Sequence, residues 1–128
     1  MKGSKFSVVN KTKSTLPSVP FAKIKNFALG EDYDLSLCFI GNKASQTLNN
    51  RFRQKNKPTN ILSFTLSKKS GEIFIAPQIV KKQTKDFNRN YNNLLTFLFI
   101  HGLMHLKGMT HGSKMEKAEE KIRRKFGI

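Results

Sequence analysis

The sequence predicts a single α+β domain, in which a small mixed β-sheet packs around a central apolar helix. Three observations favour this fold class. A chain of 128 residues with 38% hydrophobic content suits one globular domain spanning residues 1–128. Strand-like segments alternate with segments whose apolar residues recur every three or four positions. Finally, Leu94–Leu106 is apolar on nearly every side, which is typical of a helix buried among other elements.

The N-terminal third is predicted to contain two strands with a helix between them. Phe6–Val9 is a short apolar stretch that favours an edge strand. Pro20 suits the first turn of a helix, and Gly30 is a typical helix terminator. Tyr33–Ile40 alternates and then becomes apolar, which indicates a strand buried more deeply toward its end. The apolar face of the helix is expected to consist of Phe21, Ile24, Phe27 and Ala28.

A surface helix and a basic connector are predicted next. Asn42–Arg53 begins with a residue that caps helices well, and Ala44, Leu48 and Phe52 follow at helical spacing. Its other positions carry Asn, Gln and Arg, so one face should pack and the other should meet water. The polar segment Gln54–Asn60, interrupted by a proline, is expected to be a loop.

A hairpin and a further helix are predicted after the connector. Ile61–Leu66 and Glu72–Ala76 have strand character, and Lys68–Gly71 provides the turn between them. Pro77 then starts a helix whose thin apolar stripe reaches Phe87.

Two helices are predicted to complete the fold. An Asn-rich break, Asn88–Asn93, precedes the buried helix Leu94–Leu106, which Gly108 terminates. The final helix, Lys114–Phe126, is charged on one side. Its apolar side consists of Met115, Ala118, Ile122 and Phe126.

The charge of the chain indicates a polyanionic partner. Lys and Arg number 24 against 8 Asp and Glu, a formal net charge of +16. RNA, DNA and an anionic membrane surface all satisfy this requirement. Insertion into a membrane is not expected, because the longest apolar stretch, Leu94–Ile100, is far shorter than the ~20 residues of a spanning helix. The N-terminus also has no apolar signal-peptide core.

The single cysteine favours a reducing compartment. Cys38 has no partner for an internal disulfide, so the cytoplasm is the expected location. Cys38 lies in an apolar run, where a small buried hydrophobic residue is the simpler interpretation and a metal-binding thiolate the alternative.

All three histidines lie within the string HGLMHLKGMTH. His101 and His105 are four residues apart, so their rings project from one face of the buried helix and can share a cation. Gly108 reverses the chain, which lets His111 supply a third nitrogen. Three histidines suit an open, catalytic zinc site, because structural sites generally use four protein ligands. Hydrogen-bonded core histidines are the alternative, but burying two imidazoles without partners costs roughly 1 to 3 kcal/mol each.

A zinc peptidase is the first competing interpretation. Many zinc peptidases place two metal-binding histidines four apart on a helix, with a catalytic Glu directly after the first. Gly102 follows His101 in this chain, and no carboxylate occurs between His101 and His111. Because the carboxylate that activates water in a peptidase is missing, a metallopeptidase-like hydrolase is a less favoured interpretation.

Two blocks of the sequence resemble the YbeY-type endoribonucleases, the bacterial ribosomal-RNA maturation family. HGLMHLKGMTH is similar to the family pattern HGxLHLxGxDH, and RFRQKNKPTNILSF is similar to YRxKDxPTNVLSF. LNN and GEIFI extend the resemblance, which covers Leu48 to about Gly108. It implies a single-strand-specific, metal-dependent endoribonuclease that acts in 16S rRNA 3′-end maturation and ribosome quality control. The implied partners are ribosomal RNA and the small ribosomal subunit with its associated proteins.

The resemblance also implies roles for individual residues. His101, His105 and His111 are expected to bind one divalent metal ion, with Zn²⁺ as the expected metal, and Arg53 is expected to be catalytic. The guanidinium of an arginine can grip a phosphate with two hydrogen bonds and stabilise developing charge. Without the resemblance, Arg53 is simply a solvated arginine at a helix end.

The basic connector contains candidate RNA contacts. Lys55, Lys57 and Asn60 are expected to contact the RNA backbone, with a solvated charged loop as the alternative. Thr59 and Asn60 could instead turn the chain into the following strand.

The chain also departs from the family pattern. Thr110 stands where the family has Asp, so a carboxylate that could orient a metal ligand is absent at that position. Asn56 replaces an acidic residue in the other block, and the connection from His111 to the Met115 helix is shorter than usual.

A second functional hypothesis is a ribosome-associated RNA-binding protein with a structural metal. Cys38 is then the candidate fourth ligand, and thiolate charge transfer in the cobalt-substituted protein would favour it.

Overall fold

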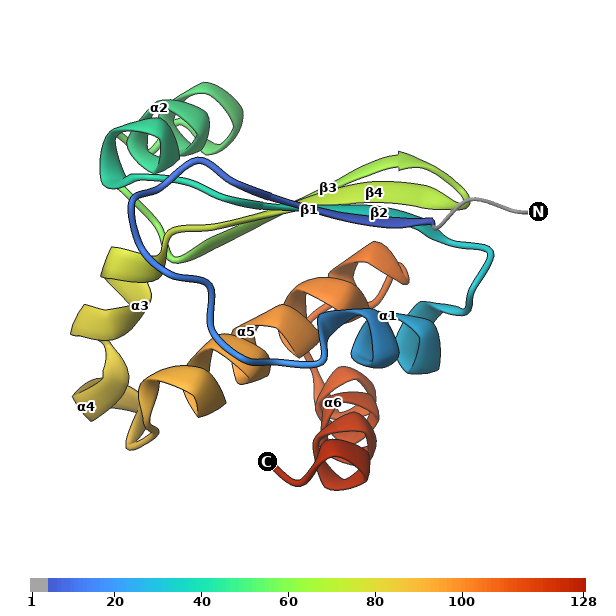
Figure 1. The fold of residues 1–128 in the computed structure, drawn as a ribbon. Coiled ribbons are helices and arrows are strands. Elements are labelled where there is room, and N and C mark those ends of the chain that lie inside the picture. The colour runs from blue at the N-terminus through green and yellow to red at the C-terminus, as the bar shows by residue number, and fades with distance from the viewer. Residues whose placement is uncertain (1–4) are drawn as a thin grey trace.

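The computed structural model describes residues 5–128. It confirms the α+β class, since four strands form one mixed sheet that packs against helices (Figure 1). The strand order within the sheet is β1-β2-β4-β3. The elements follow in the order β1 (Phe6–Asn10), α1 (Phe21–Leu29), β2 (Asp34–Phe39), α2 (Asn42–Arg53), β3 (Ile61–Ser67), β4 (Ser70–Ile75), α3 (Pro77–Lys82), α4 (Thr84–Phe87), α5 (Tyr91–Leu106) and α6 (Ser113–Phe126).

The sheet combines parallel and antiparallel pairs. β1 pairs with β2 and β2 pairs with β4 in parallel, as expected where a helix crosses between the two strands of a pair. β3 and β4 form the predicted antiparallel hairpin. The turn is shorter than predicted, because Ser70 already pairs with Ser67 and only Lys68 and Lys69 lie between them. β1 lies at one edge of the sheet, which confirms the predicted edge strand.

Helix α5 is the centre of the core, as predicted. It lies across one face of the sheet with α1 beside it, and α6 packs on the side of α5 away from the sheet (Figure 1). α5 starts earlier than predicted, at Tyr91 within the Asn-rich break, because the Asn90 side chain accepts a hydrogen bond of 2.8 Å from the Asn93 N–H and caps the helix. The buried apolar side chains of α5 are Leu94, Leu95, Leu98, Phe99, Ile100, Leu103, Met104 and Leu106.

The predicted apolar face of α1 is correct except at one position. Phe21, Ile24 and Ala28 are buried. Phe27 is 44% exposed and packs its ring edge-to-face against Phe126 of α6, with centroids 5.9 Å apart. Phe27 thus covers the α1–α6 contact instead of the sheet.

Helix α2 ends where predicted, but its N-cap is Gly41 rather than Asn42, and it buries a different face. Phe52, from the predicted apolar stripe, is 56% exposed, whereas Ser45 and Asn49 are buried. The Ser45 hydroxyl donates to the Thr59 carbonyl (2.6 Å) and accepts from the Thr59 N–H (2.9 Å), and the Asn49 amide donates to the Lys57 carbonyl (2.8 Å). The prediction was wrong because α2 packs against the polar connector rather than against the core, and its buried positions serve the backbone of that connector.

The helix predicted from Pro77 to Phe87 is interrupted at Gln83. There the chain leaves helical geometry (φ −98°, ψ 1°), and the Gln83 side-chain carbonyl accepts a 2.8 Å hydrogen bond from the Asn60 amide. The interruption separates α3 from the short α4, and Phe87 at the end of α4 is left 40% exposed.

Candidate metal centre

Helix α5 presents the first two histidines of the site side by side. His101 and His105 lie one turn apart and are half-buried, because the helix around them packs into the core on its other sides. Their Nε2 atoms are 3.0 Å apart, and their ring centroids are 4.5 Å apart. The four-residue spacing therefore brings both rings together, as the sequence predicted.

His111 reaches the same place from the loop after α5. Gly108 adopts φ +92°, a left-handed conformation that glycine accepts without strain, and it reverses the chain. The His111 ring centroid then lies 5.2 Å from that of His101 and 5.1 Å from that of His105. One nitrogen from each of the three rings lies within 4.8 Å of the others. The predicted convergence of three imidazoles is confirmed.

The surroundings of His105 favour the neutral form of its ring. Burial lowers the pKa of His105 below its usual value, and the neighbouring His101 and His111 lower it further. A hydrogen bond with the Met109 backbone acts in the opposite direction. Neutral imidazole is the form that binds metals, so the environment of His105 favours the ligand state.

The donor set fits a divalent transition metal. Zinc–nitrogen distances of about 2.0–2.1 Å in a tetrahedral site place two ligand nitrogens about 3.3 Å apart, close to the 3.0 Å between the two Nε2 atoms. Among the described residues, this group contains three imidazoles and neither a thiol nor a carboxylate. Cys38 is buried in β2, and burial raises the pKa of its thiol, which confirms the simpler interpretation of that residue.

A carboxylate that the sequence analysis missed lies next to the histidines. Glu119 of α6 is only 6% exposed, and its Oε2 is 3.1 Å from His101 Nδ1. Arg123 Nη1 lies 3.7 Å from the other oxygen of Glu119. Its helical spacing could have indicated this burial. Glu119 follows Met115 by four residues and precedes Ile122 by three, so it occupies the predicted apolar face of the last helix.

The histidines open onto a cleft of about 510 Å³. Arg53 stands at the end of α2 and Asn60 directly before β3, so the fold brings both into the wall of this cleft. Lys55 and Lys57 are exposed on the connector and do not line it. The lining residues are Arg53, Asn60, Ile61, Ser63, Phe87, Phe97, Leu98, His101, Gly102, His105 and His111.

Fold and site together define an α+β protein with a three-histidine group beside an arginine in an open cleft. The family model described as Endoribonuclease YbeY matches residues 4–127. The curated YbeY endoribonuclease of Francisella philomiragia is 31% identical over 100% of this chain and 94% of its own length. That of Francisella tularensis is 33% identical over 74% of this chain and 68% of its own length. A solution structure of TM1509 from Thermotoga maritima shares the fold, with a TM-score of 0.67 and 23% identity over 95% of this chain and 89% of that one.

The chain belongs to the YbeY family of endoribonucleases, which are enzymes that hydrolyse RNA. This finding confirms the resemblance on which the sequence analysis relied, and it extends it to the N-terminal third. Within residues 5–128, no helix combines the length and the apolar character that a membrane crossing requires.

Proposed function

We propose that this protein is a single-strand-specific, metal-dependent endoribonuclease of the cytoplasm that acts in 16S rRNA 3′-end maturation and ribosome quality control. Its partners would be ribosomal RNA and the small ribosomal subunit with its associated proteins. The observation that carries the proposal is the convergence of three imidazole nitrogens, within 4.8 Å of one another, in a cleft that Arg53 also lines.

His101, His105 and His111 would hold one divalent ion, with Zn²⁺ as the expected metal. When bound, such an ion lowers the pKa of a coordinated water to about 7 and polarises an oxygen of the substrate. Three protein ligands would leave room on the ion for an exchangeable group, which suits catalysis better than a purely structural role.

Arg53 would act on the scissile phosphate. It stands on the wall of the cleft at the end of α2, and its guanidinium can donate two parallel hydrogen bonds to phosphate oxygens. A permanent positive charge there stabilises the negative charge that gathers on those oxygens during attack.

The connector would guide the RNA backbone toward this arginine. Lys55 and Lys57 are exposed, and hydrogen bonds from Ser45 and Asn49 hold the backbone that carries them. Asn60 lies in the cleft wall, where one N–H of its amide donates to Gln83, so we assign it to the shape of the cleft and to RNA contact through its second N–H.

The alternative with a closed structural metal has less support. It requires a fourth protein ligand, and the described residues that converge here include neither Cys38 nor any other thiol. The peptidase alternative lacks a carboxylate directly after His101, and the Glu119 carboxylate is hydrogen-bonded to the His101 ring instead.

Cleavage of an unstructured RNA, compared with a duplex of the same sequence, tests the proposal. We expect Arg53→Ala to reduce cleavage about 10²- to 10³-fold, as does removal of a single donor to developing charge in other enzymes. Arg51→Ala is the matched control, because Arg51 lies on the same helix, over the Phe52 ring, and does not line the cleft. Equal activity of the two variants, or full activity of folded, metal-free His105→Ala, would contradict the proposal.

A further inference from the structure

The first inference concerns Glu119, which the sequence did not identify. Its carboxylate lies 3.1 Å from His101 Nδ1, on the opposite side of the ring from Nε2, which faces His105. A carboxylate that accepts a hydrogen bond from Nδ1–H holds the ring in the tautomer whose Nε2 is free to bind a metal. The contact therefore determines which nitrogen His101 offers.

Burial of Glu119 strengthens the effect of this contact on metal binding by His101. Glu119 is 6% exposed, and Arg123 at 3.7 Å is its second partner. A buried carboxylate next to an imidazole raises the basicity of the nitrogen that binds the metal and adds a negative charge near the cation.

We propose that Glu119 is the positioning carboxylate of the metal centre. It orients His101 and strengthens metal binding without itself touching the ion. This inference rests on the metal site of the proposed function and not on RNA cleavage.

Metal affinity of the Glu119→Gln protein tests this role. The variant keeps the shape of the side chain but removes its charge, and we expect it to bind Zn²⁺ about 10- to 100-fold more weakly in a competition with a chelating dye. Glu120→Gln is the matched control, because Glu120 is the neighbouring residue and pairs with Arg124 instead of a histidine. Affinities of the two variants within threefold of each other would overturn the proposal.

A second measurement needs no substitution. Long-range ¹H–¹⁵N NMR of the metal-free protein reports the tautomer of each histidine. We expect His101 to carry its proton on Nδ1. A neutral His101 ring with its proton on Nε2 would overturn the proposal even if the variants failed to fold, whereas loss of RNA cleavage alone would leave it standing.

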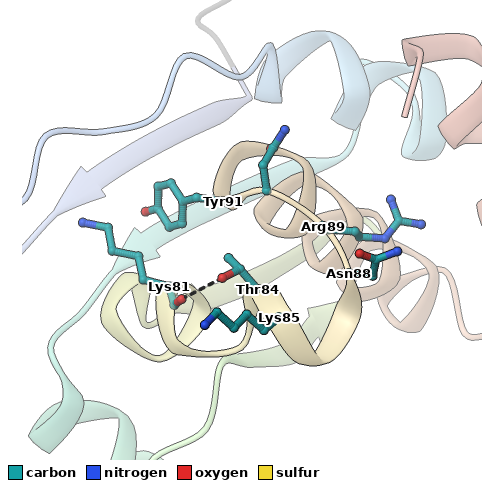
Figure 2. A pocket seen from close by; sticks show the side chains of 7 residues that line it. Lys81, Thr84, Lys85, Asn88, Arg89 and Tyr91 are labelled. Atoms are coloured by element: carbon teal, nitrogen blue, oxygen red, sulfur yellow. Dashed lines mark hydrogen bonds between the residues drawn. The ribbon is translucent and has the colours of Figure 1, made fainter.

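A second inference comes from a different surface hollow, and it rests on the proposed function. This hollow, of about 480 Å³, is lined by Thr84 and Lys85 of α4, whereas Phe87 of the same helix lines the metal cleft. Figure 2 shows Lys81 and Lys85 on one side of it and Arg89 extending on the other. No carboxylate is among its lining residues, which are Lys81, Thr84, Lys85, Asn88, Arg89, Asn90 and Tyr91.

Aromatic rings connect this hollow to the metal cleft. Phe87 is 40% exposed and lines the cleft, with its ring centroid 6.1 Å from that of Phe97. The Arg89 guanidinium lies 4.2 Å above the Phe97 ring, which also lines the cleft. Phe87 is the exposed ring of this pair, and cations beside an exposed aromatic ring are typical of surfaces that bind single-stranded nucleic acid by stacking and charge.

We infer that single-stranded RNA extends from the metal cleft across Phe87 and lays its backbone over Lys81 and Lys85. The phosphates nearest the scissile bond would then contact the cleft, and phosphates further along the strand would contact the two lysines. Only an RNA long enough to cross α4 would gain affinity from the two lysines.

Binding of short and long unstructured RNAs to the metal-free protein tests this path. We expect Lys81→Ala/Lys85→Ala to weaken binding of an RNA of about 16 nucleotides and to leave one of about 4 nucleotides unchanged. Loss of two phosphate contacts should make the logarithmic salt slope less steep by about 1.4 and reduce affinity at 0.1 M salt about 25-fold. Because the assay measures binding alone, it remains informative if the protein does not cleave RNA.

Lys68→Ala/Lys69→Ala is the matched control, since it removes the same charge from the exposed β3–β4 turn. If the control weakens the long RNA as much as the test variant does, the effect is one of net charge and the path is wrong. Equal weakening of the short and long RNAs would also overturn it.

Discussion

Gly102→Ala tests how closely α5 must approach the sheet for the site to form. A Cβ at Gly102 would lie 2.9 Å from Ser63 Oγ, 3.0 Å from Ile61 Cδ1 and 3.2 Å from Ile73 Cδ1. All three atoms end side chains that can shift, so we expect overpacking to cost about 2 kcal/mol, within the usual range for added methyl groups. The alanine regains about 1 kcal/mol through its helix propensity. The expected net change is therefore about 1 kcal/mol of destabilisation.

Urea denaturation of the metal-free protein measures this change. Gly41→Ala is the control, because Gly41 precedes α2 with φ −78° and a Cβ there would meet nothing within 4 Å. Because Gly102 directly follows His101, movement of α5 away from β3 should also shift His101 relative to the cleft wall, and Zn²⁺ affinity should fall. If Gly102→Ala were at least as stable as the control and bound Zn²⁺ as tightly as the parent, close packing of α5 on β3 would not position the site.

Three further predictions concern the histidines and the cysteine. His111→Ala should lose about one equivalent of bound metal by elemental analysis while the fold is retained, because the His111 ring lies in a loop and is exposed. The free energy of unfolding of the metal-free protein should fall as the pH decreases below 6.5: the pKa of His105 is lowered in the folded state, so the unfolded chain binds a proton that the folded chain does not. Cys38 should react slowly with a thiol reagent at pH 8 and rapidly in urea, because burial raises the pKa of its thiol; fast reaction of the native protein would contradict its burial in β2.

Local patterns predicted most of the fold. The periodicity of α2, the proline at the start of α3 and the continuous apolar run of α5 each gave elements close to those in the structure. The order of the strands was not predictable in this way, because pairing of β2 with β4 joins residues that are distant in sequence. The orientation of α2 was also missed, since its buried positions depend on hydrogen bonds with the connector.

The convergence of the three histidines was predictable because they are close in sequence. His101 and His105 share a helical face, and one glycine turn brings in His111. Glu119 comes from another helix, and its contact with His101 depends on how α6 packs against α5, which periodicity alone does not define. Its place among the apolar residues of that helix was the one visible sign.

Measuring the rate of RNA cleavage while Zn²⁺ is added tests most directly whether the three histidines form a catalytic metal centre. Protein stripped of metal would be given increasing equivalents of Zn²⁺, and the cleavage rate of an unstructured RNA would be measured in single-turnover conditions alongside His105→Ala. We expect the rate of the parent protein to rise from near zero and to level off at about one equivalent, with no rise for the variant. A rate that is high without metal and unchanged by its addition would contradict the assignment of this site.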